Sequence, residues 1–557
     1  MSAALASLFV FLLQAASTDP RADYDVKFYQ LDLTVEPEAQ RLTGLVIVDA
    51  VVVSPELTLF ELDLASSMTV DGVHAIDLED ESLVRIVDLP ALEHEHADDR
   101  LRIRVPAHKQ GERVSVAVLY HGSPQALNDF DGFHWAKTAD GRPWINTSCQ
   151  SEGARSWWPC KDSYFHPEDK PERIEVQIHL PKGLYAVSNG RLVSRSVADG
   201  VMTYLWRHEY PIPTYSVTLN VAPYEVVSSE LELPGLESKL PFVYYVLPES
   251  VEKAKLQFAD APQMLAIYSE AFGPFPFPKS KFALVETNFW GMEHSTAVAY
   301  GSSYPAWCKR EGKHDPYAAR NVWFDYILVH ESAHEWWGNA VSAADWDDFW
   351  IHEGLATYAE AVYVERTRDR AAADRYLESV RFLVPDKGSL QRGKGVDSGQ
   401  AYDEICYYKG AWVLHTLRHV LDDDAAWWRT LRAFNMEFRY RNATTRDFRA
   451  VLERESQRSF EQFFAEWFYG RGVPRLRGAV RVEGQKLRVI VANEGSDGTG
   501  FHVPLDVAWT ESGKRMQRRV ELAPGENDLT IECGAIPTDV GLLNLQRVLC
   551  SHEISMN

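Results

Sequence analysis

The sequence predicts a multidomain protein with a β-rich N-terminal region, a mainly helical middle region and a small C-terminal β-sandwich. Its 557 residues suggest several domains rather than one. Segments towards both ends alternate apolar and polar residues, which is typical of half-buried strands. In the middle region, apolar residues recur at helical spacing. From these changes of pattern we expect domains at about residues 18–228, 229–473 and 474–557.

The N-terminal segment, residues 1–17, is apolar, too short for a comfortable membrane span, and ends in small residues before Thr18-Asp19-Pro20. This pattern predicts a signal peptide and export to the periplasm or the cell exterior, although Lys and Arg are missing from its start. The alternative is an uncleaved helix that is buried or lies at an interface. No other segment is apolar enough to cross a membrane, so we expect no transmembrane segment after cleavage.

In the N-terminal domain, the runs Tyr29–Val35 and Ile174–Leu180 alternate strictly. Clusters of Gly, Pro and Asp punctuate this region, as in a sandwich or saddle of antiparallel strands. The stretch Thr147–Asp162 differs, because it is rich in aromatic and polar residues and lacks clean alternation. Such a stretch either reaches the site of another domain or packs between domains.

The middle region combines one strand-like run, Phe282–Glu286, with long helical patterns. The run leads into Asn288–His294, and Tyr407–Trp412 opens a later helix. Thr444 is placed to cap a further helix, with Asp447 as its capping-box partner. We therefore expect an α-rich region with a small sheet.

The C-terminal region returns to strands. Leu487–Val491 and Val503–Trp509 alternate again. Fewer than about ninety residues remain after Pro474, which is enough for one small β-sandwich.

Composition limits the partners of the chain. A formal net charge of −23 disfavours nucleic acid and anionic membrane surfaces. The six cysteines permit disulfides in an exported chain, and Cys533–Cys550 is the most local pair of the C-terminal region. Free, buried thiols are equally compatible with the sequence.

The most informative stretch covers residues 329–360. His330 and His334 are four residues apart, so that both project from one face of a helix. Glu353 follows on a second predicted helix. Two imidazoles and one carboxylate make a zinc site whose fourth position is open to water, and Glu331 is placed to accept a proton from that water. We expect one zinc ion per chain, bound by His330, His334 and Glu353.

The alternative is a histidine pair on a solvated helix face. The preceding residues instead predict a buried helix, marked by Val322, Trp323, Tyr326 and Ile327. A site walled off from water is also indicated by Trp336, Trp337, Trp346 and Trp350. By position alone, Asp348 and Glu360 are candidates to hold the zinc histidines in place.

These motifs resemble those of the gluzincin aminopeptidases, the aminopeptidase N family. The zinc signature is His330-Glu331-x-x-His334 followed by Glu353. Trp290–His294 resembles the family's Gly-x-Met-Glu-Asn motif. Tyr407-x-Lys409-Gly410 resembles its tyrosine motif. Gln150 and residues 154–157 resemble the N-domain strand that borders its active site.

The resemblance, which runs from about Tyr24 to Pro474, implies a β-saddle N-terminal domain, a thermolysin-like catalytic domain and a small β-sandwich. It also implies a zinc-dependent aminopeptidase acting on peptides with a free N-terminus. In such an enzyme Glu331 is the general base, and Tyr407 donates its phenol O–H to the oxyanion. The α-ammonium group of the substrate is gripped by Glu293 with help from Gln150, and Gly291 and Met292 belong to the same substrate-binding segment.

Four residues depart from the family pattern, and none is a zinc ligand: Trp290, His294, Ser148 and His352. Trp290 and His294 alter the groove that holds the substrate backbone, so the family's peptide preference does not carry over. His294, if protonated, would weaken the negative field beside Glu293 and tune the pH dependence.

Two other functions stay open, a zinc endopeptidase of the thermolysin type and a non-catalytic peptide-binding scaffold. Glu293 argues against the endopeptidase, because that enzyme has no use for an amine-binding carboxylate at the end of its subsites. The intact zinc ligands, base and tyrosine argue against the scaffold.

Overall fold

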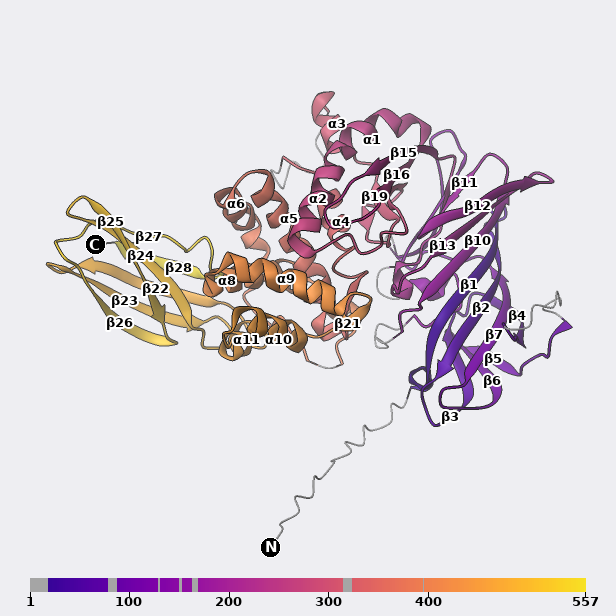
Figure 1. Ribbon diagram of the computed structural model, residues 1–557, viewed down its shortest axis with the longest axis horizontal. Coiled ribbons are helices and arrows are strands. Elements are labelled where there is room, and N and C mark those ends of the chain that lie inside the picture. Colours follow the sequence, from indigo (N-terminus) through magenta and orange to yellow (C-terminus); the bar gives the residue numbers. More distant parts are fainter. Residues whose placement is uncertain are drawn as a thin grey trace, which may run out of the picture.

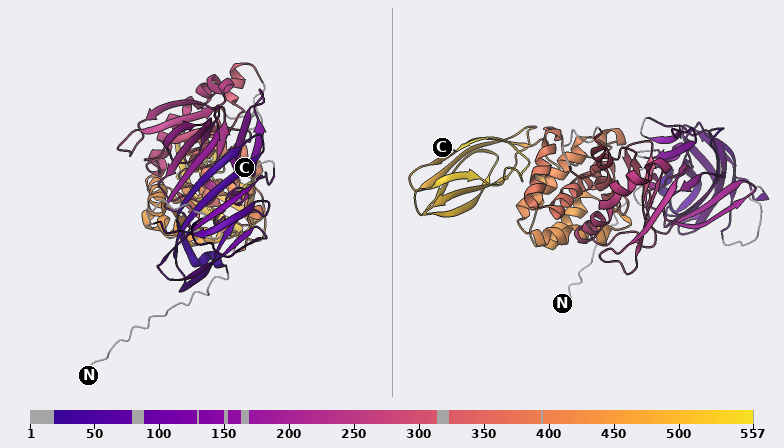
Figure 2. Two further views of the ribbon diagram at one scale, coloured as in Figure 1. Left: turned by 90° about the vertical axis from the view of Figure 1, so that its right-hand side faces the viewer. Right: turned by 90° about the horizontal axis from the view of Figure 1, so that it is seen from above.

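The computed structural model describes residues 19–78, 88–128, 131–149, 153–162, 169–313, 323–393 and 395–556. Three parts follow one another along the long axis of the molecule (Figures 1 and 2), with the N-terminal strands at one end and the C-terminal strands at the other. The helical part lies between them. No helix of the described residues is both long and apolar enough to span a membrane.

The described residues of the N-terminal part form three sheets. The largest has the strand order β12 (Arg191–Ala198), β13 (Val201–His208), β10 (Arg173–Pro181), β1 (Tyr24–Glu36), β2 (Arg41–Val52), β7 (Arg113–Gly122) and β4 (Thr69–Ala75). The second has the order β3 (Glu56–Asp63), β6 (Arg100–Lys109) and β5 (His94–Ala97). The third has the order β11 (Tyr185–Val187), β14 (Asn220–Ala222), β9 (Pro143–Ser148) and β8 (Gly132–Lys137).

Both strands predicted in this part are confirmed, and they are neighbours. Leu31 of β1 pairs with Val176 of β10 in parallel and with Val46 of β2 in antiparallel fashion. Along β1, alternate residues are buried: Tyr29, Leu31, Leu33 and Val35. The alternation in the sequence therefore reports the buried face of the sheet.

The middle part contains a five-stranded sheet with the order β15 (Glu225–Leu231), β16 (Leu240–Val246), β17 (Phe282–Thr287), β19 (Val298–Gly301) and β18 (Gly291–Met292). The domain boundary predicted at residue 228 falls inside β15, which pairs with β16. Within the described residues the edge strand β18 pairs only with β19, and it leads directly into Glu293.

Helices make up the rest of the middle part: α1 (Val251–Gln257), α2 (Ala261–Phe272), α3 (Pro305–Arg310), α4 (Tyr326–Ala333), α5 (Trp350–Thr367), α6 (Arg370–Val380), α7 (Ser398–Ala401), α8 (Gly410–Leu421), α9 (Asp424–Phe438), α10 (Thr445–Ser456) and α11 (Glu461–Trp467). A short parallel pair joins β20 (Val341–Ala343) to β21 (Arg441–Ala443). The central helix is α5, which is buried on every side along most of its length.

Two predictions about helix starts have different outcomes. The capping box is confirmed, since Thr444 and Asp447 bond to each other's backbone at the start of α10. The helix expected from Val322 onwards begins later, at Tyr326, because Asp325 accepts a hydrogen bond from the Leu328 N–H and caps it there. Trp323 precedes this helix and is 48% exposed, while Val322 lies outside the described residues.

The C-terminal part is the predicted β-sandwich. One sheet has the order β26 (Gly525–Glu532), β23 (Lys486–Gly495), β22 (Pro474–Val482) and β28 (Ser551–Met556). The other has the order β25 (Lys514–Leu522), β24 (Val503–Glu511) and β27 (Thr538–Leu542). The six cysteines all lie in the described residues and none is in a disulfide; Cys533, of the most local pair, is half-buried.

Candidate active site and metal centre

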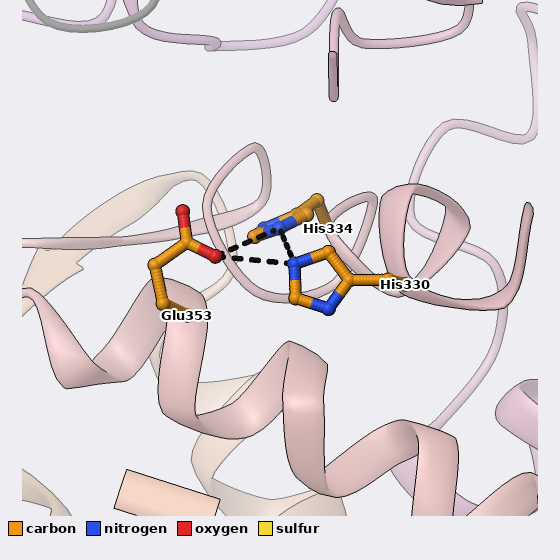
Figure 3. Close-up of side chains that lie close together, drawn as sticks. All are labelled: His330, His334 and Glu353. Atoms are coloured by element: carbon orange, nitrogen blue, oxygen red, sulfur yellow. Dashed lines mark hydrogen bonds and ion pairs between the residues drawn. The ribbon is translucent and has the colours of Figure 1, made fainter. Parts of the chain in front are cut away.

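The three predicted metal ligands come together from two packed helices. His330 lies on α4, His334 caps its C-terminal end, and Glu353 lies in the first turn of α5. Their ligand atoms converge (Figure 3): the two Nε2 atoms lie 3.2 Å apart, and Glu353 Oε2 lies 3.2 Å from His330 Nε2 and 3.5 Å from His334 Nε2. A tetrahedral zinc ion with bonds of about 2.0–2.1 Å needs ligand atoms about 3.3–3.4 Å apart. The geometry therefore fits one zinc ion.

The outer nitrogens of the histidines fix the orientation of both rings. The Nδ1–H of His330 donates to Glu360 Oε1 at 2.8 Å, and Glu360 also accepts the hydroxyl of Tyr376. The Nδ1–H of His334 donates to the backbone carbonyl of Trp337 at 2.8 Å. Each Nε2 lone pair is thereby left to face the common point, as in known zinc sites.

Of the two acidic residues proposed to hold these histidines, only Glu360 does so. Asp348 was the wrong choice, because its carboxylate instead accepts the N–H of Thr445 at 3.0 Å and its hydroxyl at 2.5 Å. It lies in the turn that precedes α5, where its side chain faces the start of α10. Glu360 lies two turns after Glu353 on α5 and so shares its face.

The electrostatics of the cluster suit a cation. Burial alone would lower the pKa of His330, but Glu353 and Glu360 raise it well above its ordinary value. Burial alone would raise the pKa of Glu353, but His334 and His330 lower it well below its usual range. The carboxylate is therefore ionised, as a metal ligand must be.

Glu331 faces the same cavity from the next position of α4. A Cβ atom on Gly291 would lie 2.9 Å from Glu331 Oε1 and 2.9 Å from Ile327 Cγ2, so the edge strand β18 passes as close to Glu331 as glycine permits. Removal from water raises the pKa of Glu331 to about 7, although His330 and His334 oppose this rise. Such a carboxyl group can both accept and return a proton near neutral pH.

Glu293 supplies a second carboxylate to the cavity, from the residue that follows the edge strand β18. It is 2% exposed, and its Oε1 has no hydrogen-bond partner among the described residues. Carboxylate atoms of Glu293 and Glu331 and a ring nitrogen of His334 lie within 4.8 Å of one another. A cationic group entering the cavity would therefore meet a buried carboxylate oxygen that makes no hydrogen bond within the described part of the chain.

The backbone of Glu293 is fixed by Asn339, a residue that the sequence analysis did not single out. Its Nδ2 donates to the Glu293 carbonyl at 2.7 Å, its own N–H donates to the His334 carbonyl at 3.0 Å, and its Oδ1 accepts the hydroxyl of Ser216 at 2.7 Å. Asn339 thus ties Glu293 to Ser216 of the N-terminal part through its side chain, and to His334 at the end of α4 through its backbone. The only sign of Asn339 in the sequence was its position shortly after the metal ligand His334.

Tyr407 lies on a short π-helix, Ile405–Lys409, that runs into α8. Its ring stacks on the ring of His330, with centroids 6.0 Å apart and planes at 22°. Two glycines allow this approach, since a Cβ atom on Gly410 would lie 2.8 Å from the Cα atom of Gly354. Burial raises the pKa of Tyr407 well above its ordinary value, and the negative charge of Glu353 adds to this rise. The phenol therefore keeps its proton.

The metal ligands and the two further carboxylates face one cavity of about 260 Å³, together with the ring of Tyr407. Its lining includes the predicted residues Gly291, Met292, Glu293, His330, Glu331, His334, Glu353 and Tyr407. Tyr326 and Tyr408 also line it, as does Trp290, which is 58% exposed. Gln150 lies outside the described residues.

His294 does not behave as expected. Its side chain is fully buried, and neither ring nitrogen has a hydrogen-bond partner among the described residues. Burial lowers the pKa of His294 to about 3, so the ring is neutral at physiological pH. The condition under which His294 would weaken the field beside Glu293, protonation of its ring, is therefore not met at physiological pH.

Comparison with known proteins identifies related chains. Residues 26–216 match the family model of the peptidase M1 N-terminal domain, and residues 257–467 match the model of the peptidase family M1 domain. The puromycin-sensitive aminopeptidase of Caenorhabditis elegans is 25% identical over 80% of this chain and 48% of its own length. The leucyl aminopeptidase of Saccharolobus solfataricus is 22% identical over 75% of this chain and 53% of its own. This chain thus spans about half the length of such relatives.

A solved structure has a similar fold. The M1 zinc metallopeptidase of Deinococcus radiodurans superposes with a TM-score of 0.65 at 22% identity, covering 81% of this chain and 95% of that one. A mutant of the same peptidase was solved with a Tyr-Ser-Ala substrate bound.

Proposed function

We propose that this chain, which belongs to peptidase family M1, is a zinc aminopeptidase that hydrolyses the N-terminal residue from peptides. The observation that carries the proposal is the pairing, in one cavity, of a three-ligand metal cluster with a separate buried carboxylate, Glu293, whose Oε1 has no hydrogen-bond partner among the described residues. The first feature serves hydrolysis and the second serves recognition of a free N-terminus.

His330, His334 and Glu353 would hold the zinc ion. When bound, zinc polarises a substrate carbonyl and lowers the pKa of a water molecule. Glu331 accepts the proton from the attacking water and passes it to the leaving amine, for which a pKa of about 7 is well placed. The Tyr407 O–H donates to the carbonyl oxygen as negative charge develops there.

Glu293 decides between exopeptidase and endopeptidase. A free N-terminus is positively charged, whereas an internal peptide nitrogen is neutral. A substrate with a free N-terminus therefore pairs with the buried carboxylate, and a blocked one leaves it unpaired at a cost in binding. The relatives named above are aminopeptidases, which favours this function over the endopeptidase and the scaffold. A mutant of the Deinococcus peptidase was solved with a tripeptide substrate, which supports peptides as the substrate class.

Two further predictions belong to this proposal. Gln150 is expected to assist Glu293 in binding the ammonium group. Export of the chain stays a prediction, since the apolar segment lies within residues 1–18, outside the described part.

The deciding experiment combines zinc analysis with hydrolysis of aminoacyl amides whose N-terminus is free or acetylated. We expect one zinc ion per chain and fast hydrolysis of the free substrates only. Equal rates on both substrates would favour an endopeptidase, and a chain without zinc whose activity resists chelators would exclude the metal mechanism.

A further inference from the structure

Lys409, two residues after Tyr407, is a buried cation held by carbonyl groups. It is 1% exposed, and its Nζ donates to the backbone carbonyls of Gly388 at 2.7 Å and Gly472 at 2.8 Å. Across the described ranges, no carboxylate lies within ion-pair distance of this nitrogen. Burial lowers the pKa of Lys409 to about 8. Because burying an ammonium group without a counter-charge is unfavourable, its two contacts call for a structural explanation.

The first contact fixes the turn that carries Tyr407. The π-helix Ile405–Lys409 is of a kind that is rare in proteins and frequent at functional sites. Tyr407 faces His330, and a residue two positions further along a helix points away from it, towards the other side. On that side lies the loop that contains Gly388. A Cβ atom on Gly388 would lie 2.8 Å from Ile405 Cδ1, so the loop packs directly on the start of the π-helix.

The second contact reaches the junction with the C-terminal sandwich. Gly472 has a φ of +80° and lies just before β22, and a Cβ atom there would lie 2.7 Å from the backbone nitrogen of Asp497. The Gly472 N–H donates to the Gly388 carbonyl at 2.9 Å, and the Gly388 N–H donates to Asp497 Oδ2 at 3.1 Å. One hydrogen-bonded unit is thus formed by Asp497 of the sandwich together with Gly388, Gly472 and Lys409.

We propose that Lys409 is a positioning residue, which locks the π-helix to this junction and thereby holds Tyr407 beside the metal ligands. The C-terminal sandwich then contributes to turnover although none of its described residues lines the cavity. The inference rests on the role proposed for Tyr407. Because that phenol acts as charge develops, a loosened turn lowers kcat more than it raises KM.

Lys409→Met keeps the aliphatic stem and removes the donors. We expect kcat to fall about ten- to a hundredfold, as for other residues that orient an active-site group, while zinc content is unchanged. Hydrogen–deuterium exchange of the peptide covering residues 403–412 should become faster. In a Tyr407→Phe background, Lys409→Met should cause little further loss, because both changes remove the same interaction.

A second variant protects the test against poor folding of the first. Asp497→Ala removes the acceptor of the Gly388 N–H and should change kcat and exchange in the same direction by a smaller factor. Asp528→Ala is the matched control, since it removes a carboxylate that pairs with Arg488 at an exposed site of the same sandwich, on β26.

Two results would overturn the proposal: exchange and kcat of Lys409→Met that match the wild type, or a full additional loss in the Tyr407→Phe background. A wild type that hydrolyses no aminoacyl amide would instead contradict the proposed function. The exchange measurement would in that case still decide whether Lys409 holds the turn.

Discussion

The cavity has a metal side, formed by the zinc ligands and Tyr407, and an amine side, formed by Trp290 and Glu293. The two sides are built differently. On the metal side, both histidines use their outer nitrogen for a hydrogen bond at 2.8 Å, and Tyr407 stacks on one of the rings. On the amine side, Glu293 leaves Oε1 without a partner among the described residues, and Trp290 is largely exposed. Groups that perform the chemistry are oriented in advance, whereas groups that recognise the substrate leave contacts for it to complete.

The largest effect is expected on the metal side, at the base. Glu331→Gln keeps a side chain of the same size but cannot accept the proton, so kcat should fall by about 10²–10⁴. Zinc content should be unchanged, because Glu331 is not a ligand. Steady-state kinetics together with elemental analysis measure both; a near-normal rate would show that another residue is the base.

Tyr407→Phe should rank next. Loss of one donor to a developing oxyanion typically lowers turnover by about 10²–10³. KM should change little, because the ring and its stacking on His330 remain. A change confined to KM would make Tyr407 a substrate-binding residue.

On the amine side, Glu293→Ala should act on selectivity. Its carboxylate offers a charge-assisted bond to the free N-terminus, and loss of such a bond reduces kcat/KM about ten- to a hundredfold. N-acetylated substrates should lose much less, so the ratio between the two substrate types shrinks. If that ratio stays at its wild-type value, the amine is bound elsewhere.

Glu360→Gln tests how the metal side is held together. Removal of the charge that His330 donates to should weaken zinc binding about ten- to a hundredfold. Asp348→Asn is the natural comparison, since Asp348 has a similar distance in sequence from Glu353 but bonds to Thr445. Zinc competition with a chelator should separate the two variants, and equal zinc affinities would contradict the assignment.

The smallest effect on catalysis is expected at His294. Its ring is neutral with a pKa of about 3, against about 6.5 when unfolded, so the unfolded chain takes up a proton in that range and the folded chain does not. The folded protein therefore loses stability as pH falls below about 6.5, by about 2 kcal/mol at pH 5 from this group. His294→Asn should reduce this loss in acid unfolding and leave the pH–rate profile in place. A shifted profile would return His294 to an active role.

Local patterns of the sequence determined much of this protein. The i, i+4 spacing places His330 and His334 on one face, and Glu353 and Glu360 two turns apart share a face of α5, because helical periodicity requires no distant contact. Strand alternation located β1, β10, β23 and β24 for the same reason. The motif resemblance added Glu293 and Tyr407, which periodicity alone does not identify.

Only the tertiary structure decided the rest. Asp348 and Glu360 are both acidic residues near Glu353, but one lies in a turn whose direction is set by packing against α10. The neutral state of His294 depends on burial, and the place of Tyr407 depends on the Gly354–Gly410 contact and on Lys409 reaching two distant carbonyls. These facts are contacts between residues far apart in the chain, and their geometry is fixed by packing rather than by local sequence.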